Sequence, residues 1–81
     1  MTQEKTVEKK LSRAAIETLA IIVYHQPVTR AEIEEIRGVA FGNNTLEILM
    51  ELNWVKTGGR KNTPGKPIQY VTTDDFLSHF N

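Results

Sequence analysis

The sequence predicts a mostly α-helical domain with a small β-hairpin, an α+β fold, on three observations. Apolar residues recur every three or four positions from Leu11 to Leu52, which is helical spacing. The spacing changes to two residues at Trp54, and a loop rich in glycine, proline and basic residues then separates two short alternating segments. The length of 81 residues corresponds to one domain. We expect residues 1–10 to be a flexible tail or linker stub and residues 11–81 to fold.

The first helix is predicted over residues 13–25, with Ser12 as its N-cap and Pro27 as its stop. The stripe that we expect to be buried consists of Ala15, Leu19, Ile22 and Val23, widened by Ile16 and Ala20. Ile21 falls on another side, so this helix is apolar over more than one face. Such a helix lies between layers or presents a face to a partner.

The second helix is specified at both ends. Thr29 is the N-cap, and Glu32 three residues later completes a capping box. Gly38 is predicted to end this helix of about eight residues in a left-handed conformation. Ile33 and Ile36 share one face of it.

The third helix is predicted to be capped by Asn43 or Asn44 and to continue to about Asn53. Its apolar side carries Leu46, Leu49 and Met50, and its opposite side carries Glu47 and Glu51 with Ile48 at the edge. The helix is therefore amphipathic, with acidic rather than basic groups facing outward.

Residues 54–57 and 68–72 are predicted to be the strands of a hairpin, followed by a short helix that Thr73 caps. Val28 could add a strand of one residue before the second helix. Three helices followed by a hairpin is the layout of a winged helix-turn-helix.

The decapeptide between the strands, GGRKNTPGKP, is interpreted as the wing of that fold. Gly58 and Gly59 are expected to let the first strand leave its ladder, and Pro64-Gly65 to make a turn. A phosphate-binding P-loop requires four residues between its glycines and a hydroxyl after its lysine. Here five residues separate Gly59 from Gly65, and a proline follows the lysine. A nucleotide site is therefore not predicted.

Composition and motifs give no sign of an enzyme, a metal centre or a cofactor. Apolar residues make up 40% of the chain, ten basic residues balance ten acidic ones, and cysteine is absent, which excludes disulfides and thiolate metal ligands. His25 and His79 lack a second ligand at helical spacing. The polar N-terminus and the lack of a long apolar run predict a cytoplasmic protein without membrane contact.

The main alternative is a winged-helix DNA-binding protein such as a transcriptional regulator. The wing offers four candidate phosphate contacts, Lys56, Arg60, Lys61 and Lys66. Such a fold reads bases with its third helix, however, and here Glu47 and Glu51 would be repelled by phosphates, at about 1 kcal/mol each. We therefore expect DNA contact to be at most weak and non-specific.

Four motifs together closely resemble the C-terminal half of the segregation and condensation protein B family: ETLAII, QPVTRAEIEEIRGV, GRKNTPGKP and the ending TT..FL..F. The resemblance runs from Leu11 to about Phe80. It implies a winged-helix domain, one of two in full-length family members, and a non-enzymatic adaptor in the bacterial SMC–kleisin condensin complex. The implied partners are the kleisin, segregation and condensation protein A, and through it SMC, in nucleoid-associated chromosome condensation and segregation.

The resemblance also implies a homodimer for full-length members, mediated in the family by a first winged helix. These 81 residues do not include that domain, so dimerisation is less expected for this chain than for a full-length member. The residues that we expect to be candidates for the partner surface are Ile21, Phe41, Ile48, Trp54 and Phe76. Trp54 and Phe76 are expected to belong mostly to the core, whereas Phe41 lies in a loop before a glycine and is the candidate most expected to be exposed.

Overall fold

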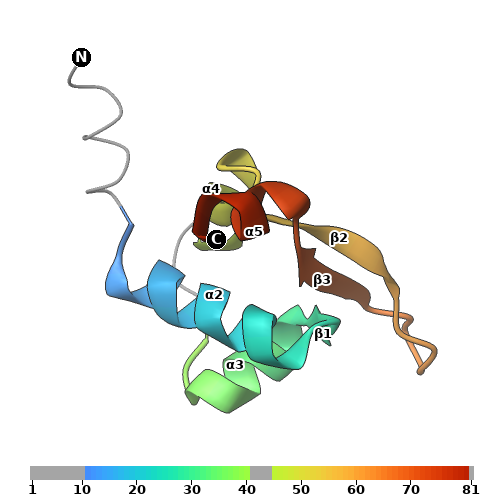
Figure 1. Cartoon of the computed structure of the whole chain (residues 1–81). Coiled ribbons are helices and arrows are strands. Elements are labelled where there is room, and N and C mark those ends of the chain that lie inside the picture. The colour runs from blue at the N-terminus through green and yellow to red at the C-terminus, as the bar shows by residue number, and fades with distance from the viewer. Residues whose placement is uncertain (1–10, 41–44, 81) are drawn as a thin grey trace.

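The computed structural model describes residues 11–40 and 45–80, with the backbone alone for Phe80. In chain order the elements are α2 (Arg13–His25), β1 (Val28–Thr29), α3 (Arg30–Arg37), α4 (Thr45–Glu51), β2 (Val55–Arg60), β3 (Ile68–Thr72) and α5 (Asp74–Phe80). This order confirms the predicted winged helix-turn-helix (Figure 1). We call β2, the 61–67 loop and β3 the wing. None of the helices in these two described segments is long and apolar enough to cross a membrane.

Local capping groups set the helix ends, as predicted. The Ser12 hydroxyl accepts a hydrogen bond from the Ala15 N–H at 3.1 Å at the start of α2. Thr29 and Glu32 exchange both bonds of the capping box, at 3.1 and 2.9 Å. Gly38 ends α3 with a φ of 84°, a left-handed conformation that glycine adopts without steric cost. Asn43 and Asn44, the predicted caps of α4, lie outside the described residues.

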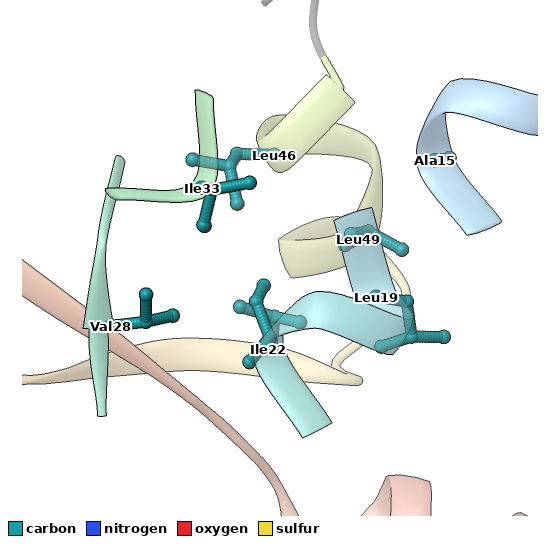
Figure 2. Close-up of a cluster of buried hydrophobic side chains, with 8 residues drawn as sticks. Ala15, Leu19, Ile22, Val28, Ile33, Leu46 and Leu49 are labelled. Carbon is teal, nitrogen blue, oxygen red and sulfur yellow. The ribbon is translucent and has the colours of Figure 1, made fainter. Parts of the chain in front are cut away.

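One hydrophobic core lies between α2, α3, α4 and the sheet. Its buried residues are Ala15, Leu19, Ile22, Val28, Ile33, Leu46, Leu49 and Val55. Side chains from α2, β1, α3 and α4 point toward one another in Figure 2. Burial of this apolar surface is the main stabilising contribution to a domain of this size.

The predicted apolar stripes are wrong at their edges. On α2, Ile16 is 54% exposed, Val23 is 39% exposed and Ala20 is also exposed. Ile36 on α3 is 47% exposed, and Met50 on α4 is 40% exposed. Each shares a helix face with a buried residue but lies further around the helix, and so small a domain buries only the centre of each face. The third helix also ends earlier than predicted, at Glu51, because Asn53 has a φ of 62° and forms the turn into β2.

The sheet has three antiparallel strands in the order β1-β3-β2. Val28 pairs with Tyr70, which confirms that a very short strand precedes α3. Gln26 fixes the connection between α2 and β1, because its side-chain oxygen accepts a bond from the Thr72 N–H at 2.8 Å. In Figure 1 the wing extends away from the helices as a twisted ribbon.

The two wing glycines do not end the ladder, contrary to prediction. β2 continues through them to Arg60, which pairs with Ile68 after a bulge. Gly59 has a φ of 113°, and a Cβ on Gly58 would lie 2.9 Å from a methyl carbon of Val71. The glycines therefore permit a bulge and a close approach between strands. The turn predicted at Pro64-Gly65 is present, since Gly65 has a φ of 83°.

Gly58→Ala should destabilise the protein by about 1 to 2 kcal/mol, because the new methyl group clashes with a β-branched side chain that has little freedom to move. Urea denaturation measures the loss. The same change in a Val71→Ala background should cost clearly less, since the colliding methyl groups are then gone. Equal costs in the two backgrounds would show that the close approach is not what requires glycine here.

Candidate partner-binding surface

Helix α2 carries two apolar stripes, and only one of them is buried. Ala15 and Ile22 on the first stripe are fully buried. The second stripe consists of Ile16, Ala20, Val23 and Tyr24, all of which are exposed. Ile16 is 54% exposed and Tyr24 is 85% exposed, so large apolar or aromatic side chains at both ends of this stripe face solvent.

This second stripe forms one wall of an open pocket with a volume of about 550 Å³. The pocket is lined by Leu11, Ile16, Leu19, Ala20, Val23, Tyr24, Trp54 and Phe76. The lining contains no acid, base or nucleophile, and its polar atoms in side chains are only the Tyr24 hydroxyl and the Trp54 indole N–H. Its chemistry therefore suits the burial of apolar side chains and offers nothing for catalysis.

The opposite wall is fixed by contacts between the turn before β2 and helix α5. The Thr73 N–H donates to the Trp54 carbonyl at 3.0 Å, and the Thr73 hydroxyl caps α5 by accepting from the Phe76 N–H at 3.1 Å. The rings of Trp54 and Phe76 meet edge to face, with centroids 5.9 Å apart. The His79 ring lies 5.2 Å from the Trp54 ring. In Figure 1, α2 lies between α3 and α5.

The structure brings two of the five candidate partner residues into this pocket. Trp54 and Phe76 line it and are half-buried against the core. Ile21 and Ile48 are also half-buried but do not line it, and Phe41 lies outside the described residues. The sequence prediction placed Ile16, Ala20 and Val23 in the buried stripe of this helix, whereas the structure exposes all three, so helical spacing alone did not show which residues form the outer stripe.

The four wing cations are not equivalent. Lys56, Arg60 and Lys66 are exposed, whereas Lys61 is half-buried and forms an ion pair with Glu32 of the capping box. The hydrogen bond from Lys61, followed by the one from the Thr29 backbone, holds the pKa of the Glu32 carboxyl below its ordinary value of 4.5. This ion pair ties the wing to the start of α3.

We expect the Glu32–Lys61 pair to make stability depend on pH. Because the folded state lowers the pKa of Glu32, the pair stabilises the protein above pH 4.5 and is lost as the pH falls through the lowered value. The wild type should lose unfolding free energy between pH 6 and pH 3 as Glu32 is protonated. Lys61→Met, which lacks the pair, should lose less, and the difference should be at most about 1 kcal/mol because the pair is partly exposed. Urea denaturation at both pH values measures it, and an equal loss in wild type and variant would contradict the assignment.

The outer face of α4 is acidic, as predicted. Glu47 and Glu51 are both exposed, on the helix that would enter the DNA groove in a DNA-reading winged helix. Neither forms an ion pair with a side chain in the described segments 11–40 and 45–80. Their charge therefore opposes an approach of phosphates to this face.

The sequence matches the family described as segregation and condensation complex subunit ScpB over residues 1–81. The chain belongs to this segregation and condensation protein B family. It is 52% identical over 77 residues to segregation and condensation protein B of Clostridium perfringens (strain SM101), and 51% identical over 74 residues to that of Caldanaerobacter subterraneus. The family name describes a complex subunit that acts in segregation and condensation, which agrees with the resemblance drawn from the motifs.

Two solved structures share this fold, and one of them is a segregation and condensation protein B. ScpB from Mycobacterium tuberculosis superposes with a TM-score of 0.79 at 33% identity, covering 96% of this chain and 50% of that chain. A conserved hypothetical protein from Chlorobium tepidum superposes with a TM-score of 0.80 at 40% identity, covering 91% of this chain and 45% of that chain.

The chain spans only part of the length of its relatives. Its match covers 95% of this chain but 39% of the Clostridium perfringens protein, and 91% of this chain but 44% of the Caldanaerobacter protein. The partners and activity of a full-length family member are therefore proposed for this chain and not shown for it.

Proposed function

We propose that this chain is a non-enzymatic adaptor of the bacterial SMC–kleisin condensin complex, acting in chromosome condensation and segregation. In this proposal it binds the kleisin, segregation and condensation protein A, and through it SMC. The observation that carries the proposal is the open apolar pocket between the second stripe of α2 and the Trp54–Phe76 wall.

The pocket supports a protein segment as the occupant. An amphipathic helix buries a row of apolar side chains when it lies in a hydrophobic groove. The second stripe of α2 offers such a row, and Trp54 is the residue type that most often contributes strongly to interface energy. Carboxylates on α4, by contrast, leave that helix face unsuited to a nucleic acid.

Isothermal titration calorimetry of a kleisin fragment into this chain tests the proposal. We expect saturable binding with a negative heat-capacity change, because apolar surface is removed from water. A second titration should use a protein extended by the N-terminal half of a full-length relative. If the kleisin fragment bound to neither protein, the proposed function would be rejected.

A DNA-binding winged helix is the second candidate, favoured by the exposed cations Lys56, Arg60 and Lys66. If each neutralised one phosphate, log affinity would fall with log salt concentration at a slope of about −2.7. Lys61 is left out of this count because Glu32 already neutralises it. Tight binding to one DNA sequence would favour this candidate over the adaptor, and binding that is absent or insensitive to salt would reject it.

A further inference from the structure

A second groove lies on a different part of the molecule, between α3 and the wing. It has a volume of about 440 Å³ and shares no lining residue with the pocket described above. Ile68, Tyr70 and Pro67 give it an apolar floor, and Ile68 is 38% exposed. Cationic side chains line it from both sides: Arg30 from α3, and Arg60 and Lys66 from the wing.

Two of these cations lack a counter-charge. Arg30 lies 3.7 Å from Glu34 on α3, so its charge is balanced within the groove. Neither Arg60 nor Lys66 has an ion-pair partner within residues 11–40 and 45–80. The groove therefore presents a net positive charge beside an apolar floor.

The wing side of the groove is held in place by its own hydrogen bonds. Arg60 donates to the Lys66 carbonyl at 3.0 Å, and the Lys66 N–H donates to the Thr63 carbonyl at 2.8 Å. The Lys61 N–H donates to the Pro67 carbonyl at 2.9 Å, and the Lys61 side chain pairs with Glu32 of α3. A site ordered before binding loses less conformational entropy when a ligand arrives.

We propose that this groove binds a short acidic peptide segment that carries an aliphatic or aromatic side chain. Two carboxylates would pair with Arg60 and Lys66, and the apolar side chain would cover Ile68 and Tyr70. A nucleic acid suits the groove less well, because the side chains of Pro67 and Ile68 in the floor offer a phosphate neither charge nor a hydrogen bond. This proposal does not depend on the proposed kleisin binding, which we assign to the other pocket.

The probe is a labelled octapeptide of sequence GDELFEDG, titrated into the isotopically labelled 81-residue chain while amide shifts are recorded. We expect saturable shifts that centre on the groove residues of α3 and the wing. A peptide with Asn and Gln in place of the acids, GNQLFQNG, should bind about tenfold more weakly, and so should GDESSEDG, which lacks the apolar pair.

Lys66→Gln should weaken binding of GDELFEDG about fivefold, and Lys66→Arg should restore it, because the charge returns. Arg13→Gln is the matched control, since Arg13 is an exposed cation that does not line the groove. Unchanged thermal midpoints show that each variant folds. An equal effect of Arg13→Gln, or equal binding of GNQLFQNG, would overturn the proposal. Preferential binding of octathymidylate to the same residues would overturn it in favour of single-stranded nucleic acid.

Discussion

Ala20→Asp should weaken kleisin binding by about 100-fold, or about 2.7 kcal/mol, while the domain stays folded. Ala20 is exposed in the free protein and lines the apolar pocket. A carboxylate at this position is hydrated until the partner arrives. Binding would then bury it among Leu19, Val23 and Trp54, which offer it no cation. This desolvation therefore weakens the binding free energy and leaves the stability of the free domain unchanged.

The measurement is calorimetric titration of the kleisin fragment into wild type and variant, with thermal unfolding as the test of folding. Ala31→Asp provides the matched control, because Ala31 is also an exposed alanine on a helix but lies outside this pocket. We expect the control to bind as wild type does. Loss of binding in Ala31→Asp with normal binding in Ala20→Asp would place the kleisin on the other groove, which Ala31 lines.

The parts of the fold that could be predicted from the sequence are those set by local chemistry. Ser12, Thr29 and Gly38 act on neighbours within four positions in the chain, so their caps follow from the sequence alone. The same holds for the turn at Gly65. Helix order and the change of spacing at Trp54 then limit the fold to a winged helix.

The candidate site was less predictable because it depends on residues far apart in the chain. Two stripes of α2 are similarly apolar, and the position of α4 and the sheet decides which one is covered. Trp54 completes the pocket, and its backbone carbonyl accepts a hydrogen bond from the Thr73 N–H, which lies beyond the wing. Likewise, the ion pair of Lys61 with Glu32 joins residues 29 positions apart, which no local pattern indicates.

The same non-local packing separates two neighbours that the sequence placed on one helix face. Leu49 is fully buried, whereas Met50 is 40% exposed. Figure 2 shows the Leu49 side chain among the buried side chains of the core, and its helix α4 packs against α2. The two residues differ little in size and hydrophobicity, so substituting each with alanine isolates the effect of position.

Leu49→Ala should cost about 2 to 5 kcal/mol of unfolding free energy, because it removes buried methyl groups and leaves a cavity between two helices. Met50→Ala should cost less than about 1 kcal/mol. A domain of 81 residues has a total stability of about 4 to 12 kcal/mol, so the first loss threatens folding and the second does not. Leu49 also accepts the Trp54 N–H through its backbone carbonyl at 3.1 Å, a bond that alanine keeps. Urea denaturation with an unchanged slope therefore measures packing alone, and equal losses for the two variants would show that α4 does not present Leu49 to the core.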